Sequence, residues 1–269
     1  MVARPIAWTI AGTDPSGGAG IQADLKVFHS LGVYGGSAIT AIVVQNTVGV
    51  RAVHPLDSAL VGAQIECLAE DLPPRAIKIG MLATASNVRM VAKRLEGIEA
   101  PVVVDPVLSS SGGVALLDEH GLQELIHGLL PRATLLTPNL IEAARILGRD
   151  ELGVSDMPTA AFALLELGPS AVLLKGGHTG GGECRDFLAM RTGEARWLVS
   201  PRQFVTHTHG TGCTLSSAIA AFWAHGQPLG PAVALGKAYV NQGLRLGGGI
   251  GRGRGPLAHL GWPDSVADL

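Results

Sequence analysis

The six residues from 209 to 214, His-Gly-Thr-Gly-Cys-Thr, are the group whose types and spacing are best suited to chemistry. An apolar, helix-periodic run follows from Leu215 to Trp223, so we expect a helix to begin here. The first turn of a helix presents unpaired N–H groups and the positive end of its dipole, and glycines let an anion approach. We therefore interpret Gly210, Thr211 and Gly212 as an anion-binding loop suited to phosphoryl transfer. The alternative is a glycine-rich loop that only caps a core helix.

Cys213 lies in the first turn of that helix, where we expect the pKa of its thiol to fall. A thiolate there could accept the proton of a hydroxyl nucleophile, although a nearby phosphate would oppose it. Action through the backbone N–H alone is the alternative. His207 and His209 raise the idea of a zinc site, but with Cys213 they supply at most three ligands and match no standard pattern. We instead expect His209 to orient the loop.

Short apolar runs rich in β-branched residues recur along the chain and predict buried strands. They cover residues 6–11, 38–44, 77–79, 102–104, 135–137 and 171–174. Helix-periodic segments lie between most of them, which predicts a mainly parallel α/β sheet covered on both faces. Ligands bind beyond the carboxyl ends of the strands in such sheets. No long linker divides the chain, so we predict one domain over residues 1–269 with a site at that edge.

Polar residues stand directly after several of these predicted strands. Asp105 follows residues 102–104 and precedes Pro106, so it could belong only to a turn. The functional interpretation makes it a carboxylate that holds Mg²⁺ near phosphates, directly or through water. Lys175 closes an apolar strand and, with Gly176, Gly177 and His178 after it, is suited to neutralise nucleotide phosphates.

Asn139 and Glu142 have the spacing of a helix capping box. The competing interpretation has Glu142 reaching a hydrated Mg²⁺ beside a triphosphate. Both can hold in part, because the same helix terminus can face an anion.

Three further segments have both a structural and a functional interpretation. Gly17 to Gly20 precede a helix that carries Asp24, either as a simple turn or as room for a ligand that Asp24 contacts. The amide of Gln45 could satisfy a turn or bind a heteroaromatic ring. Residues 247–257 contain two arginines among glycines but no aromatic residue, so a loop lining an edge is favoured over an RNA-binding segment.

Composition restricts the class of protein. The 269 residues are 47% hydrophobic and 16% charged, and the net charge of −2 gives no basis for a nucleic-acid or polybasic membrane surface. No apolar run approaches the roughly 18 residues that a membrane span requires. The three cysteines are scattered, which fits a reducing cytoplasm.

Taken together, these motifs resemble the hydroxymethylpyrimidine/phosphomethylpyrimidine kinases of thiamine biosynthesis. Residues 11–26, Ala-Gly-Thr-Asp-Pro-Ser-Gly-Gly-Ala-Gly-Ile-Gln-Ala-Asp-Leu-Lys, are similar to the N-terminal signature of that family. Further matches follow in order along nearly the whole chain, at residues 32–35, 45–47, 78–82, 104–107, 137–142, 175–178, 208–214 and 255–259. The resemblance implies a ribokinase-like three-layer α/β/α fold, with a central mostly parallel sheet and a small flap over the substrate.

The resemblance also implies ATP with Mg²⁺ and two successive phosphorylations, of 4-amino-5-hydroxymethyl-2-methylpyrimidine to its monophosphate and then to its diphosphate. Carried over by position, the residues expected to bind the pyrimidine are Gly12, Asp24, Gln45, Met81 and Val107. Those expected to form the catalytic anion hole are Gly210, Thr211, Gly212 and Cys213. Those expected to serve the metal and the nucleotide phosphates are Asp105, Glu142, Asn139 and Lys175.

One departure concerns the second phosphorylation. Ser110 stands where the family commonly has a lysine, and serine cannot supply that charge. Lys26 is one candidate to replace it. A pyridoxal kinase of the same fold is the nearest rival function, and a non-catalytic pyrimidine-binding regulatory protein is a rival of another class. Family members often pair, so a homodimer is also expected, with residues 33–44 as a candidate contact.

Overall fold

The centre of the molecule is an eight-stranded sheet of order β10-β9-β8-β7-β6-β5-β1-β2. The computed structural model describes residues 4–110, 112–177 and 181–259. The strands are β1 Ile6–Ala11, β2 Tyr34–Ile39, β5 Ala76–Ile79, β6 Val102–Val104, β7 Leu135–Leu136, β8 Ala171–Lys175, β9 Glu183–Met190 and β10 Ala195–Pro201. Neighbours from β2 to β8 are parallel, whereas β8, β9 and β10 pair antiparallel. The predicted, mainly parallel sheet is therefore confirmed.

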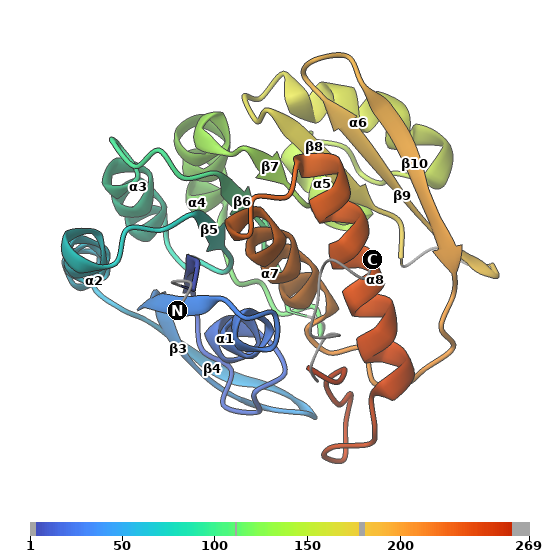
Figure 1. Ribbon diagram of the computed structural model, residues 1–269, viewed down its shortest axis with the longest axis horizontal. Coiled ribbons are helices and arrows are strands. Elements are labelled where there is room, and N and C mark those ends of the chain that lie inside the picture. The colour runs from blue at the N-terminus through green and yellow to red at the C-terminus, as the bar shows by residue number, and fades with distance from the viewer. Residues whose placement is uncertain (1–3, 111, 178–180, 260–269) are drawn as a thin grey trace.

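Helices cover both faces of this sheet (Figure 1). One face carries α1 Gly20–Ser30, α7 Thr211–Ala224 and α8 Leu229–Leu246. The other carries α2 Ser58–Asp71, α3 Ala85–Arg94, α4 Glu119–Glu124 with its π-helical continuation Leu125–Leu129, α5 Leu140–Ile146 and α6 Met157–Leu165. Successive strand residues alternate between the two cores, as Val103 and Val104 do, because side chains along a strand point to opposite faces. The predicted three-layer arrangement is confirmed.

A separate two-stranded antiparallel ribbon is formed by β3 Ala41–Asn46 and β4 Gly49–Pro55. The prediction of one strand over residues 38–44 was wrong, because the chain leaves the main sheet at Thr40. The buried Thr40 hydroxyl donates to the Met81 carbonyl at 2.6 Å, and its N–H donates to the Ala11 carbonyl at 3.1 Å. These bonds fix the point at which the ribbon, which we call the flap, departs.

The sequence patterns identified neither the β9–β10 hairpin nor α8. Short 3-10 turns at Leu130–Arg132 and Val154–Asp156 complete the described elements. In the part of the chain that the structure describes, no helix has both the length and the apolar character needed to cross a membrane.

Candidate active site

A cavity of about 1180 Å³ opens at the carboxyl ends of the parallel strands. Its wall includes Gly12 after β1, Met81 after β5, Asp105 after β6 and Asn139 after β7. All of the residues predicted from the sequence to form the site line this cavity, with the exception of Asp24. The topology therefore brings together side chains that lie up to two hundred positions apart in the sequence, as expected for a parallel α/β sheet.

The anion loop, residues 209–213, packs backbone against backbone on the loop that follows β1. Gly210 has φ of 79°, and a Cβ there would lie 1.7 Å from the Gly18 carbonyl oxygen. Gly20 is equally confined, because its Cβ would lie 2.4 Å from the Gly12 carbonyl oxygen. α7 begins at Thr211, so its first N–H groups lie in the cavity wall next to this contact. Glycine is required at positions 210 and 20 because neighbouring backbone lies too close for a Cβ, and because φ is positive at both.

Asp14 and His209 tie these two loops together. His209 Nε2 lies 2.7 Å from Asp14 Oδ2, and the same carboxylate accepts hydrogen bonds from the backbone N–H groups of Ser16, Gly18 and Ala19. Burial opposes ionisation of Asp14, yet the hydrogen bonds from His209 and Ser16 lower its pKa well below the usual range. His209 thus holds the anion loop against the loop after β1, which is consistent with the orienting role expected for it. The described residues contain no group of three His, Cys, Asp or Glu side chains that could hold a metal ion.

Cys213 lies in the cavity wall, but its thiol is not acidified. Burial raises its pKa to about 11, and the charges of Asp24 and Asp105 add to this effect while Lys78 opposes it. The expectation of a lowered pKa is therefore wrong for this structure. Desolvation and the neighbouring carboxylates outweigh Lys78 and the hydrogen bond with the Gly20 backbone, both of which favour the thiolate.

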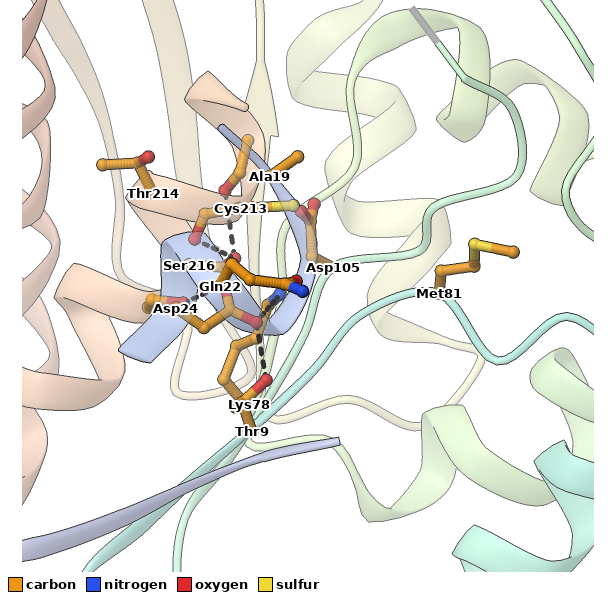
Figure 2. Close-up of polar contacts among 12 residues, drawn as sticks. Thr9, Ala19, Gln22, Asp24, Lys78, Met81, Asp105, Cys213, Thr214 and Ser216 are labelled. Atoms are coloured by element: carbon orange, nitrogen blue, oxygen red, sulfur yellow. Dashed lines mark hydrogen bonds and ion pairs between the residues drawn. The ribbon is translucent and has the colours of Figure 1, made fainter. Parts of the chain in front are cut away.

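Asp24 does not line the cavity. Figure 2 shows its carboxylate beside Lys78 and Thr9. Its carboxylate is fully buried and accepts hydrogen bonds from Thr9 Oγ1 at 2.5 Å and Ser217 Oγ at 2.6 Å, and it pairs with Lys78 Nζ at 2.7 Å. The expectation that Asp24 contacts the substrate gains no support from this geometry, because the carboxylate is fully buried and does not line the cavity. Lys78 does line the cavity, but the sequence patterns did not identify it as a site residue. The signal that could have identified it is a charged residue within an otherwise apolar strand, residues 76–79.

Asp105 after β6, Glu142 in the first turn of α5 and Lys175 at the end of β8 form a charged cluster. Lys175 Nζ lies 2.9 Å from Asp105 Oδ1, and the Thr137 hydroxyl donates to the same oxygen at 3.2 Å. The predicted capping box is confirmed: Asn139 N–H donates to Glu142 Oε2 at 2.8 Å, and Glu142 N–H donates to Asn139 Oδ1 at 2.9 Å.

Electrostatics within this cluster favour a cation between its carboxylates. Burial raises the pKa of Glu142, and the Asp105 charge raises it further, while Lys175 opposes the rise. The pKa of Lys175 is raised by Asp105 and Glu142 in spite of its burial. Two buried carboxylates at a cavity wall match the way Mg²⁺ binds with one or two carboxylates and substrate phosphates.

Sequence reasoning missed a second ion pair in the same wall. Lys237 of α8 pairs with Asp186 of β9, and Asp186 Oδ1 also accepts the Gly176 N–H at 3.0 Å. His178, which the resemblance included, lies outside the described residues. Lys26, the candidate named for the charge absent at Ser110, does not line the cavity, and its Nζ donates to the Gly17 carbonyl at 2.7 Å.

Comparison with known proteins gives one consistent result. Residues 14–258 match the family model described as phosphomethylpyrimidine kinase. A hydroxymethylpyrimidine/phosphomethylpyrimidine kinase of Staphylococcus aureus is 42% identical over 265 residues, which cover 97% of this chain and 96% of that protein.

Solved structures of two kinds of vitamin kinase are similar to this chain. A crystal structure of phosphomethylpyrimidine kinase from Clostridium difficile is 42% identical, with a TM-score of 0.78 over 89% of this chain and 99% of that one. An ADP complex of Bacillus subtilis pyridoxal kinase is 35% identical, with a TM-score of 0.89 over 96% of this chain and 98% of that one. With a ribokinase-like fold, a glycine-built anion loop and these relatives along nearly its whole length, the chain belongs to the phosphomethylpyrimidine kinase family.

Proposed function

We propose that this protein uses ATP to phosphorylate 4-amino-5-hydroxymethyl-2-methylpyrimidine to its monophosphate and then to its diphosphate, in the cytoplasm, as one domain over residues 1–269. The observation that carries the proposal is the anion loop at the start of α7, which faces a cavity shared by Gln45 of the flap and Lys175 of β8. One cavity thus combines a surface for a flat heterocycle with a charged surface for phosphates. Its volume, about 1180 Å³, exceeds that of ordinary single-ligand pockets.

The pyrimidine would lie at the flap end of the cavity. Gly12 carries no side chain there, and Met81 and Val107 supply apolar walls, while the Gln45 amide offers a donor and an acceptor to ring nitrogens and the amino group. A Cβ at Gly12 would approach Met81 Sδ to 3.2 Å, so a larger residue would narrow this end.

The nucleotide phosphates would lie between Lys175 and the anion loop. Asp105 and Glu142 would hold Mg²⁺ together with phosphate oxygens, and the metal would neutralise charge on the transferring group. Asn139 fixes Glu142 through the capping box, and the backbone N–H groups from Thr211 to Cys213 would bind the phosphoryl oxygens as charge develops.

The substrate hydroxyl attacks the γ-phosphorus in line, and we assign Cys213 as the acceptor of the hydroxyl proton. A thiol with a pKa near 11 is almost entirely neutral at pH 7, so this role requires ionisation when substrates bind. A cation bound at Asp105 would favour it, because it would offset the carboxylate that opposes the thiolate. If no ionisation occurs, the residue contributes only its backbone N–H.

A coupled assay tests the proposal directly. The purified protein is incubated with ATP, Mg²⁺ and the pyrimidine alcohol, and products are identified by mass spectrometry. We expect the monophosphate to appear first and the diphosphate to follow, with one ADP released at each step. Absence of pyrimidine-dependent ADP formation would refute the proposal and leave the non-catalytic binding protein as the better interpretation.

Pyridoxal kinase is the second candidate, supported by the TM-score of 0.89 to the Bacillus subtilis enzyme. Pyridoxal also carries a hydroxymethyl group on a nitrogen heteroaromatic ring. Comparing kcat/KM for the two alcohols separates the functions, and we expect the pyrimidine to be preferred.

A homodimer through the flap is also part of the proposal. The flap leaves Ile42 and Val44 of the candidate contact exposed, together with Val48 between its two strands, and these side chains would be covered in such a dimer. Sedimentation of the protein with and without Val48→Asp tests this arrangement, and a wild-type monomer would exclude it.

A further inference from the structure

The positively charged side chains that line the cavity differ in whether they form an ion pair with a carboxylate of the protein. Among the described residues these cations are Lys78, Lys175, Arg202, Lys237 and Arg254. Each of the three lysines pairs with a carboxylate, Asp24, Asp105 and Asp186 respectively.

The two arginines are held differently from each other. Arg202 donates to the carbonyls of Gly177 and Gly181, both at 2.8 Å, so its guanidinium is engaged beside the loop after β8. Arg254 is exposed at the cavity wall and makes no hydrogen bond or ion pair with any residue that the structure describes. Its guanidinium is therefore available to a ligand.

The backbone around Arg254 is held over the flap by close contacts. Gly253 N–H donates to Thr47 Oγ1 at 3.3 Å, and a Cβ at Gly253 would lie 2.0 Å from the Thr47 carbonyl oxygen. Gly255 N–H donates to His207 Nδ1 at 3.1 Å, just before the anion loop. These contacts place residue 254 between the tip of the flap and the anion loop. The glycine-rich segment therefore lines the cavity edge, as predicted, instead of extending away as an RNA-binding arm.

The substrate end of the cavity otherwise has no unpaired cation among the described residues. Gln45 and Val50 come from the flap, and Ser110 comes from the loop after β6; none of these carries a charge. Ser110 Oγ is already engaged, because it accepts the Val114 N–H at 3.1 Å. A neutral alcohol can bind there without a cation, but a phosphate monoester brings about −1.5 to −2 charges. Among the residues that the structure describes, Arg254 is therefore the unpaired cation at the end of the cavity where the second phosphorylation places an anion.

We propose that Arg254 binds the phosphate of the monophosphorylated substrate and thereby selects it for the second phosphorylation. This inference rests on the proposed function. A phosphate oxygen of the monophosphate attacks the γ-phosphorus of ATP, a new P–O–P linkage forms, and the bond to the β,γ-bridging oxygen breaks with its electron pair leaving on ADP. Arg254 transfers no proton; its planar fork of donors holds the phosphate oxygens and offsets their charge.

The test compares Arg254→Gln with Arg252→Gln. Arg252 is exposed in the same glycine-rich segment but does not line the cavity, so it controls for loss of a surface charge. Each step is measured separately, with the alcohol and with the purified monophosphate as acceptor. We expect Arg254→Gln to lower kcat/KM for the monophosphate about 10- to 100-fold, mainly through KM, since hydrogen bonds to charged groups are worth about 1.5–3 kcal/mol. The same constant for the alcohol should remain unchanged.

Two further measurements sharpen the result. Calorimetric binding of the monophosphate without ATP should weaken in Arg254→Gln and not in Arg252→Gln. Adding Ser110→Lys to Arg254→Gln should restore second-step activity, because residue 110 lines the same cavity and can return the missing charge.

Three outcomes would overturn the inference. They are equal losses in both steps, equal effects of the Arg252 and Arg254 variants, and a wild-type enzyme that stops at the monophosphate. A wild-type protein that fails to phosphorylate the alcohol would instead refute the proposed function, so the two failures are distinguishable.

Discussion

The anion loop and the lysine–carboxylate pairs line the same cavity, yet they are built in different ways. The loop consists of main-chain N–H groups, and its shape depends on Gly210 and Gly18 meeting at backbone distance. The pairs consist of long side chains from strand ends, such as Lys78 and Lys175, each held by a carboxylate. The loop offers a ligand correctly placed N–H donors that carry no net charge. Each lysine offers a positive charge that a carboxylate of the protein already neutralises.

The difference follows from the free energy of burial. A buried lysine without a partner is costly, so the chain supplies Asp24 to Lys78 and Asp105 to Lys175. Backbone N–H groups at a helix start carry no net charge, so steric constraint from glycines is enough to fix them. The two regions should therefore fail differently on mutation: the pairs through stability and the loop through catalysis.

The buried pair should give the largest effect. Lys78→Met leaves the fully buried Asp24 carboxylate without its cation and should lower the free energy of unfolding by about 3–5 kcal/mol. Urea denaturation measures this change, with the exposed Lys93→Met as control. Adding Asp24→Asn should recover part of the loss, and a Lys78→Met protein as stable as the wild type would show that the pair is dispensable.

The shape of the anion loop is tested by Gly210→Ala. The added Cβ clashes with the Gly18 carbonyl, so the loop must shift and kcat should fall about 10²- to 10³-fold, the usual cost of losing an oxyanion donor. Gly226→Ala is the matched control, since Gly226 follows the other end of α7 with φ of 87° and open space around it. Equal activities of the two variants would contradict the packing argument.

The chemistry of the loop is tested by Cys213→Ala. If the thiol accepts the hydroxyl proton, kcat should fall by about 10²-fold, with the exposed Cys67→Ala as control. Burial raises the pKa of this thiol to about 11, so its ionised fraction grows with pH throughout the neutral and alkaline range. The wild-type kcat should accordingly rise between pH 7 and 9 and the variant's should not. Near-wild-type turnover in Cys213→Ala would leave only the backbone role.

A small effect is expected at His259, which supports the start of α7 through a 2.9 Å contact between its Nε2 and Thr214 Oγ1. Burial lowers the pKa of His259 to about 4, with Lys26 adding to the shift. Between pH 4 and 6.5 the unfolded chain therefore binds more protons at this residue, and its contribution to stability grows as the pH rises.

His259→Gln removes this titration and should reduce the loss of Tm on going from pH 7 to pH 5 by a few degrees. The exposed His120→Gln serves as control. If both variants follow the wild-type pH dependence, His259 does not contribute to acid sensitivity.

Sequence patterns predicted elements well where a single local rule governed them. The strands over residues 6–11 and 102–104 have the predicted bounds, because each is a buried apolar run in a parallel sheet. The Asn139–Glu142 capping box was found for the same reason, since its two partners are three residues apart. The break at Thr40 could not be predicted, because it depends on hydrogen bonds to Ala11 and Met81, which are distant in sequence.

The chain by itself determined the α/β order of its elements, the glycines of the anion loop and the polar residues that end its strands, because these depend on backbone preferences and short-range spacing. Only the tertiary structure decided the roles of individual charges. It buried Asp24 against Lys78, raised the pKa of Cys213 and left Arg254 at the cavity wall without an ion pair to any described residue. Each of these outcomes depends on how deeply a group is buried and on charged residues from distant parts of the sequence. A local sequence pattern contains no information on either.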